Sequence, residues 1–94
     1  DIVTSFRPDR VFHLSGTLTH DLERDFRNNV LSTAVLLEAI RKAGLRTRVL
    51  LTGSAAEYGV PACNPVPEDA PLNPVSSYGA TKVHQTVLMQ TAYH

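Results

Sequence analysis

Val49-Leu50-Leu51-Thr52-Gly53-Ser54 is the stretch that indicates the fold. It is a short uncharged run that ends in glycine and serine, as strands buried in a parallel sheet do. A similar run, Arg10-Val11-Phe12-His13-Leu14-Ser15-Gly16, lies earlier in the chain. The two runs predict two parallel strands, each buried on both faces.

The segment between the two runs, residues 22–43, has the periodicity of a helix. Apolar residues recur at intervals of three and four, which places them on one helix face. The residues on this face are Leu22, Phe26, Val30, Thr33, Leu37 and Ile40. Gly44 follows and is placed to end the helix in the left-handed conformation.

A long loop and a second helix follow the second strand. Residues 57–75 hold five of the six prolines, and loops of that length in compact domains are usually functional. Ser76 or Ser77 can cap a helix that continues from Tyr78, and residues 1–6 are typical of the last turn of another helix. The order strand, helix, strand, loop, helix predicts an α/β fold with right-handed crossovers.

The composition argues against several classes of function. Nine basic residues balance nine acidic ones, and they are scattered, so the chain has no electrostatic footprint for nucleic acid or an anionic membrane. No apolar run is long enough to cross a bilayer. The one cysteine, Cys63, excludes an internal disulfide and a zinc cluster and fits a reducing cytosol. We expect a cytoplasmic protein with no metal, nucleic-acid or membrane partner.

Tyr78 and Lys82 place a phenol and an ammonium one turn apart on a single helix face. A cation held close to a phenol favours the phenolate, which can exchange a proton with an alcohol or carbonyl. Alone the pair is weak evidence, because an exposed tyrosine beside a solvated lysine has the same spacing. Ser54 adds to it, since it follows a strand at the edge where open α/β sheets bind ligands.

Four segments, in the correct order, resemble the extended short-chain dehydrogenases/reductases, and among them the NAD-dependent epimerase/dehydratase family. The segments are residues 8–16, 28–39, 52–59 and 67–82. The resemblance covers nearly the whole chain. It implies that residues 1–94 are the central fragment of an NAD(P)-binding Rossmann-like domain, a partial doubly wound layer. The first βα units and the substrate domain would lie outside it.

The resemblance also implies roles for individual residues. Tyr78 would be the acid–base, Lys82 would hold the nicotinamide ribose and favour the phenolate, and Ser54 would orient the substrate oxygen. The cofactor is NAD or NADP. Its expected contacts, besides Tyr78 and Lys82, are Leu14, Ser15, Gly16, Asn28 and Thr52, with Asn29 as an alternative to Asn28. His13, between apolar neighbours, has the pattern of a hydrogen-bonded core residue.

The activity that the resemblance implies is hydride transfer at C4 of a nucleotide sugar. Net 4-keto reduction is favoured over 4-epimerisation. Dehydration is disfavoured, because Ala55 and Ala56 stand where the family's 4,6-dehydratases have acids, and Glu57 lies farther on. A non-catalytic dinucleotide or nucleotide-sugar binding module, or a fragment inactive on its own, are the alternatives. Apolar residues on more than one face of helices 22–43 and 78–93 predict a homodimer through these helices.

Overall fold

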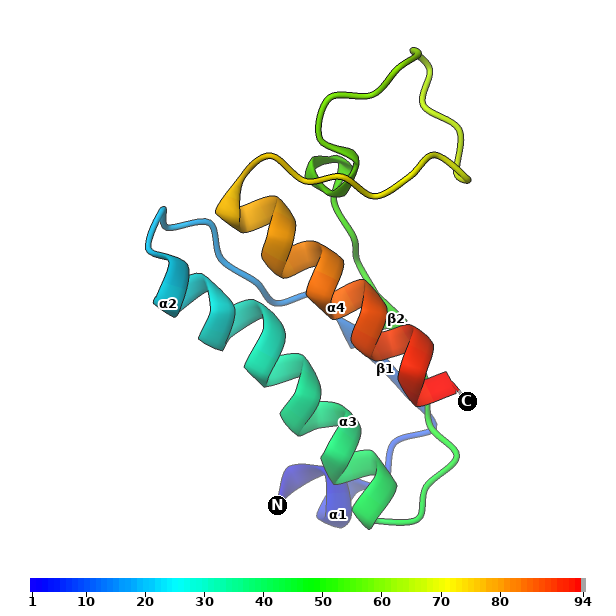
Figure 1. Ribbon diagram of the computed structural model, residues 1–94. Coiled ribbons are helices and arrows are strands. Elements are labelled where there is room, and N and C mark those ends of the chain that lie inside the picture. Colours follow the sequence, from blue (N-terminus) through cyan, green and yellow to red (C-terminus); the bar gives the residue numbers. More distant parts are fainter. Residues whose placement is uncertain (94) are drawn as a thin grey trace.

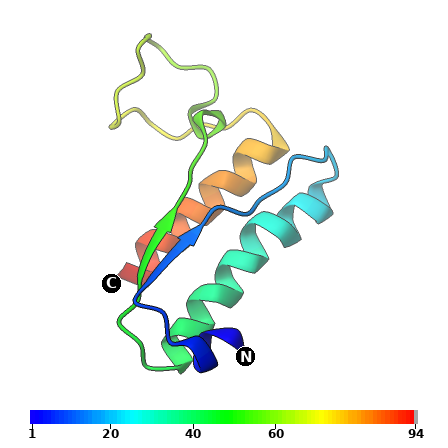
Figure 2. The same cartoon turned by 180° about the vertical axis from the view of Figure 1, so that it is seen from behind.

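The computed structural model describes residues 1–93, and the side chains of residues 1–92. Two parallel strands carry two long helical segments on one face, in front of the strands in Figure 1 and behind them in Figure 2. The elements are α1 (Ile2–Phe6), β1 (Arg10–His13), α2 (Leu22–Asp25), the π-helical segment η1 (Phe26–Leu31), α3 (Ser32–Lys42), β2 (Arg48–Leu51), the 3₁₀ turn η2 (Ala55–Tyr58) and α4 (Ser77–Tyr93). The order of elements expected from the sequence is confirmed.

The sheet is covered on one face only. β1 and β2 pair in parallel, with Phe12 opposite Leu50. These two side chains point to the bare face and are 63% and 54% exposed. Their neighbours Val49 and His13 are half-buried. The prediction of strands buried on both faces is therefore wrong for this chain, because both long helical segments lie on the same side of the strands (Figure 2).

The segments α2, η1 and α3 form one continuous helical segment, Leu22–Lys42. The Asp21 side chain caps its beginning. Gly44, with φ of 66°, ends it in the left-handed conformation, as expected. The predicted face is buried at Val30, Thr33 and Ile40, whereas Leu37 is half-buried and Leu22 and Phe26 are exposed.

Polar residues fill the space between this helical segment and α4. The residues that are buried there almost completely are Asp25, Asn29, Thr33, Thr81 and Gln85. Asn29 Nδ2 donates to Thr81 Oγ1 (3.0 Å), and Gln85 Nε2 donates to Thr33 Oγ1 (2.8 Å). Hydrogen bonds of this kind offset the cost of removing polar groups from water. The two helical segments are therefore joined in large part by paired polar groups.

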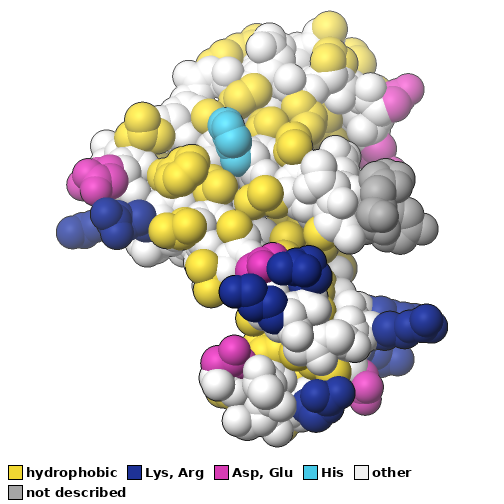
Figure 3. Space-filling model, turned by 60° about the horizontal axis from the view of Figure 1, so that its bottom comes forward, with side chains coloured by type: hydrophobic (Ala, Val, Ile, Leu, Met, Phe, Trp, Pro, Cys, Tyr) yellow, Lys and Arg dark blue, Asp and Glu magenta, His cyan; other side chains and the backbone are white. Residues whose placement is uncertain are grey.

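The outward side of the helices carries several exposed apolar side chains in addition to its charged ones. Leu22, Phe26, Val35 and Val87 are exposed. Figure 3 shows hydrophobic side chains gathered on one part of the surface, with most of the visible charged side chains at the other end. The surplus apolar face that the sequence predicted is thus present on the helices.

Candidate functional site

Two segments leave the carboxyl ends of the strands side by side: residues 14–19 after β1, and residues 52–59 after β2. Strands in open α/β sheets place ligands at this edge. The turn η2 lies beside the beginning of α4 (Figure 1). The structure therefore brings the segments that follow both strands, and the helix that carries Tyr78 and Lys82, to one end of the fold.

Ser54 begins the turn η2 and is fixed by two hydrogen bonds. Its Oγ accepts from the backbone N–H of Ala56 (3.1 Å), and its own N–H donates to Glu57 Oε2 (2.8 Å). The side chain is half-buried. Because Oγ accepts from Ala56, the hydroxyl proton of Ser54 is available for another oxygen.

The turn packs closely on α4 at two points. A Cβ on Gly79 would lie 2.6 Å from the carbonyl oxygen of Ala56, so only glycine permits this approach. Three residues along the helix, Lys82 Nζ donates to the carbonyl oxygen of Thr52 (3.1 Å). Tyr78, next to Gly79, is half-buried. The packing thus places the Ser54 turn against the helix turn that carries Tyr78.

Lys82 is buried, with 5% of its surface exposed. Burial lowers the pKa of its ammonium, and the carboxylate of Glu57 acts in the opposite direction. One of its three N–H groups is directed to Thr52, which leaves donors for other oxygens.

The proline-rich loop connects η2 to α4, and its two ends are joined by a hydrogen bond. The N–H of Asn73 donates to the carbonyl oxygen of Glu57 (2.9 Å). The carbonyl oxygen of Asn73 sits against Gly59, where a Cβ would lie 1.9 Å away, and Gly59 has φ of 67°. A residue with a side chain at Gly59 would be excluded on both counts.

The loop after β1 is held by Asn29. Its Oδ1 accepts from the N–H of Thr17 (2.7 Å), and its Nδ2 donates to the carbonyl oxygen of Thr17 (2.9 Å). Gly16 lies so close that a Cβ would be 3.1 Å from Asn29 Oδ1. Asn29 is fully buried, so it supports the loop from beneath, whereas Asn28 is exposed and can contact a ligand.

A second buried group, the carboxylate of Asp25, holds the same loop. It accepts from Thr17 Oγ1 (2.9 Å) and from both the N–H (3.0 Å) and Oγ1 (2.9 Å) of Thr19. Burial raises the pKa of Asp25, but the hydrogen bonds from Thr17 and Thr19 outweigh it and the pKa is lowered. The carboxylate is therefore held in its charged form.

His13 is a hydrogen-bonded residue, as the sequence predicted. Its Nε2 lies 3.0 Å from Thr33 Oγ1. Since that hydroxyl donates its proton to the carbonyl oxygen of Asn29 (2.7 Å), Nε2 of His13 carries the shared proton. Burial, and then the charge of Lys82, lower the pKa of His13.

The expected cofactor contacts lie on the open edge of this end. Leu14 (64% exposed), Ser15, Gly16 and Thr52 are exposed, because β1 ends at His13 and β2 at Leu51. Asp25 and Glu57 are supporting residues that were not among the predicted site residues. Both had a signal in the sequence: Asp25, Asn29 and Thr33 recur every four residues on one helix face, and Ser54 and Glu57 have the spacing of a capping box.

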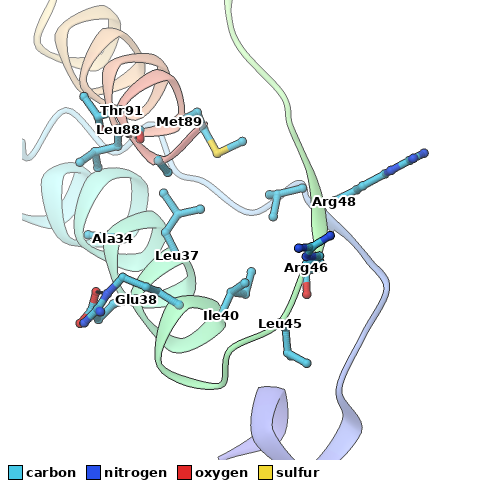
Figure 4. Close-up of a pocket in the computed structure, with 14 residues that line it drawn as sticks. Ala34, Leu37, Glu38, Ile40, Leu45, Arg46, Arg48, Leu88, Met89 and Thr91 are labelled. Atoms are coloured by element: carbon cyan, nitrogen blue, oxygen red, sulfur yellow. Dashed lines mark hydrogen bonds and ion pairs between the residues drawn. The ribbon is translucent and has the colours of Figure 1, made fainter. Parts of the chain in front are cut away.

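A separate groove lies elsewhere in the fold. It has a volume of about 1120 Å³ and lies between α3, α4 and the start of β2 (Figure 4). Leu37, Leu88 and Met89 are among its largely apolar lining residues. Because it is at the amino end of β2, away from Ser54 and Lys82, it is separate from the candidate site.

Two further features concern the described residues only. Residues 1–93 hold no group of three or more His, Cys, Asp or Glu side chains arranged for a metal ion. No helix among them combines the length and apolar character needed to cross a membrane.

Comparison with known proteins identifies the family. A family model described as GDP-mannose 4,6 dehydratase matches residues 1–94. The chain belongs to this family. The match confirms the resemblance to NAD-dependent epimerases/dehydratases that the motifs indicated.

Individual relatives agree with this assignment. A UDP-glucose 4-epimerase from Mycolicibacterium smegmatis is 37% identical over 87 residues, which cover 87% of this chain and 28% of that protein. A D-erythronate dehydrogenase from Cupriavidus necator is 40% identical over 83 residues, covering 84% of this chain and 26% of that protein. The chain therefore spans less than a third of the length of these relatives.

Almost all of this chain superimposes on part of a solved structure. The Bordetella bronchiseptica enzyme WbmG, in complex with NAD and UDP, superimposes with a TM-score of 0.88 at 32% sequence identity. The overlap covers 96% of this chain and 29% of that one. The α/β, Rossmann-like fold class is thereby confirmed.

Proposed function

We propose that residues 1–94 are the central part of an NAD(P)-binding domain, in a longer protein that transfers hydride at C4 of a nucleotide sugar. The observation that carries this proposal is the packing of the Ser54 turn on α4, which brings Ser54, Tyr78 and Lys82 to the carboxyl ends of two parallel strands. The relative named UDP-glucose 4-epimerase and the WbmG complex with NAD and UDP support the class of cofactor and substrate.

The residues at this edge fit NAD or NADP. When bound, the nicotinamide gives or takes the hydride. Lys82 keeps ammonium N–H groups that suit ribose hydroxyls. The exposed stretch Leu14, Ser15 and Gly16, with Asn28 and Thr52 beside it, offers backbone and polar groups for the rest of the cofactor. The choice between NAD and NADP belongs to residues outside these contacts.

The proposed roles follow from the groups that remain available. Tyr78 gives a proton to, or takes one from, the C4 oxygen of the sugar while hydride moves at the carbon. Ser54 donates its free hydroxyl proton to the same oxygen and orients it. Lys82 favours the phenolate through its charge and also holds the ribose.

Dehydration is a less suitable reaction for this site. Ala55 and Ala56 have no proton to give, and Glu57 is 6% exposed with both carboxylate oxygens accepting hydrogen bonds. That leaves 4-keto reduction, which the motifs favour, and 4-epimerisation, which the name of the Mycolicibacterium relative favours. Both use the same three residues. In reduction, hydride would pass once from NAD(P)H to C4, whereas in epimerisation it would first leave C4 and then return to the opposite face.

A product assay on the full-length protein that contains these residues tests the proposal. Net reduction consumes NAD(P)H in proportion to a 4-keto sugar, whereas epimerisation interconverts two nucleotide sugars without net consumption. Oxidation of D-erythronate would instead favour the second candidate, a sugar-acid dehydrogenase, for which the Cupriavidus relative is the evidence. Cofactor binding without any turnover would instead support the non-catalytic binding module and would contradict the proposal that the protein is an enzyme.

We further propose that the longer protein is a homodimer through helices 22–43 and 78–93. The exposed apolar residues Phe26, Val35 and Val87 lie on these helices. A standard interface buries about 1,600 Å² in total. Sedimentation at micromolar concentration tests this: Val87→Asp is expected to give monomers, whereas Val60→Asp, at an exposed loop position, is not. A monomeric wild-type protein would overturn it. The cytoplasmic location stays a prediction, which cell fractionation tests.

A further inference from the structure

The carboxylate of Glu57 is enclosed by donors from two elements. Oε2 accepts from the N–H of Ser54 (2.8 Å), and Oε1 accepts from Thr86 Oγ1 on α4. A Cβ on Gly53 would lie 2.7 Å from Oε2, so the glycine makes room for the carboxylate. Only 6% of the Glu57 surface is exposed. A buried carboxylate with both oxygens used is suited to holding structure and unsuited to meeting a substrate.

Glu57 and Lys82 act on the same short segment. Lys82 Nζ binds the carbonyl of Thr52, and the Glu57 carboxylate binds the N–H of Ser54, two residues later. Thr86, which binds Glu57, lies one helix turn after Lys82. No direct ion pair joins Glu57 to Lys82 among the described residues, so the two charges interact through space.

The charges around Lys82 come from different elements. Glu57, from η2, raises the pKa of Lys82 against the larger lowering effect of burial. His13, from β1, is near enough for the charge of Lys82 to lower its pKa. On α4 itself, Tyr78 precedes Lys82 by one turn. Glu57 is thus the negative group that opposes the desolvation of this ammonium.

We propose that Glu57 is the positioning residue of this site: its carboxylate clamps the Ser54 turn to α4 through Thr86 and so holds a negative charge one helix turn from buried Lys82. Glu57 acts through Ser54 and Lys82, without touching substrate or cofactor. The proposal deepens the proposed function and rests on it for its kinetic consequences. It gives the sequence Gly53-Ser54-Ala55-Ala56-Glu57 a role beyond that of carrying Ser54.

Glu57→Gln in the full-length protein separates charge from geometry. The amide oxygen of glutamine can accept from the N–H of Ser54, and its NH₂ can donate to the hydroxyl of Thr86, which rotates to accept. The charge is lost while the clamp remains. We expect the alkaline limb of kcat/KM, where Lys82 loses its proton, to move to lower pH. Glu68→Gln, at an exposed glutamate in the proline-rich loop, is the matched control and should leave the profile unmoved.

Thr86→Val makes the complementary change. It keeps the Glu57 charge and removes one hydrogen bond of the clamp. We expect kcat to fall on the order of tenfold, because small displacements of reacting groups are costly, while the alkaline limb stays in place. Thr86→Ser restores the hydroxyl and should restore kcat. An unmoved alkaline limb in Glu57→Gln would overturn the charge role, and wild-type kcat in Thr86→Val would overturn the clamp.

Direct titration of Lys82 distinguishes failure of this proposal from failure of the proposed function. If the wild-type protein shows no turnover, the proposed function is contradicted, but the role of Glu57 can still be tested. Carbon-13 NMR of labelled lysine, assigned with Lys82→Arg, then compares the pKa of Lys82 in the wild type and in Glu57→Gln. A fall in the variant supports the role of Glu57, and equal values overturn it. If Glu57→Gln does not fold by circular dichroism, Glu57→Asp, which keeps the charge on a shorter side chain, takes its place; unchanged kcat would then count against the clamp.

Discussion

Each of the two loops that follow the strands is held by a buried carboxylate, but the two carboxylates differ in what else they contact. After β1, the buried carboxylate of Asp25 binds Thr17 and Thr19. After β2, the buried carboxylate of Glu57 binds the backbone of Ser54. In each loop, an acid from the helical segment that follows satisfies N–H or hydroxyl donors of the chain just before it. Both carboxylates avoid the cost of burial because donors surround them.

The difference lies in what else each carboxylate reaches. The hydrogen-bond donors to Asp25 all come from the loop that it holds, and none carries a positive charge. Glu57 also accepts a hydrogen bond from Thr86 on α4, and its charge opposes the lowering of the Lys82 pKa by burial. We infer that Asp25 only holds its loop in place, whereas Glu57 also couples its loop to the proposed chemistry. Substitution of Asp25 should therefore cost stability, and substitution of Glu57 should cost turnover.

The largest expected effect is that of Tyr78→Phe, because the proposed proton transfer depends on this hydroxyl. We expect kcat to fall by roughly 10²- to 10⁴-fold, the usual contribution of a general acid–base, with cofactor affinity nearly unchanged. Steady-state kinetics and a cofactor binding titration measure the two effects. Tyr58→Phe, the same loss of a hydroxyl at a tyrosine outside the proposed proton transfer, is the control. Near-normal turnover in Tyr78→Phe would remove the assigned role.

Lys82→Met should weaken cofactor binding as well as turnover, since the lysine has two proposed tasks. Loss of the ammonium removes both the donors for the ribose and the charge that favours the phenolate. The same binding titration and kinetics therefore separate this variant from Tyr78→Phe. Intact nicotinamide affinity in Lys82→Met would show that the ammonium does not hold the ribose.

A pair of glycine substitutions tests whether the Ser54 turn must touch α4. In Gly79→Ala the new Cβ meets the Ala56 carbonyl oxygen at 2.6 Å, so the turn has to move. We expect a loss of about 1–3 kcal/mol from overpacking, with kcat lower by up to about 100-fold. Gly44→Ala meets nothing within 4 Å but keeps φ near 66°. It should cost about 1–2 kcal/mol of stability and leave kcat unchanged.

Urea unfolding and steady-state kinetics are measured for both variants. Gly79→Ala reports the effect of crowding at the site, and Gly44→Ala reports the effect of backbone strain far from it. Equal kcat in the two variants would contradict the importance of the contact between the turn and α4.

The sequence predicted the elements well because each has a local cause. The glycine-terminated apolar runs gave both strands, and Gly44 ends its helix in the left-handed conformation. Ser76 and Ser77 were both possible caps; Ser76 is used, accepting from the N–H of Gly79 (3.0 Å). Capping propensity does not distinguish two adjacent serines, because the first residue of the helix depends on where the proline-rich loop returns to the turn η2.

The buried side of the long helical segment was less predictable. Apolar periodicity indicated the face with Leu22 and Phe26, yet these are exposed, and Asp25 and Asn29 are buried. The reason is that the loop after β1 lies on that side, and the backbone groups of Thr17 and Thr19 need polar partners there. Only the tertiary arrangement shows which donors and acceptors a helix must satisfy. The contact of Glu57 with Ser54 follows a capping-box pattern that the sequence carries, whereas its contact with Thr86, 29 residues away, depends on the tertiary arrangement.

The smallest expected effect on turnover is that of Asp25→Asn, and it tests the comparison between the two loops most directly. At neutral pH the variant should be less stable, because an amide group faces donors that a carboxylate accepts from. The pKa of Asp25 in the folded protein is lowered from its ordinary value of 3.8. Its contribution to stability is therefore complete above that value and is lost as the pH falls through the folded value. The difference in free energy of unfolding between wild type and Asp25→Asn should accordingly be largest near neutral pH and become smaller in acid.

Urea unfolding at neutral and at acid pH measures this difference, with Asp9→Asn at an exposed position as the control. If Asp25→Asn also moves the alkaline limb of kcat/KM, as Glu57→Gln is expected to do, then both carboxylates act on Lys82 and the division between scaffold and chemistry is wrong.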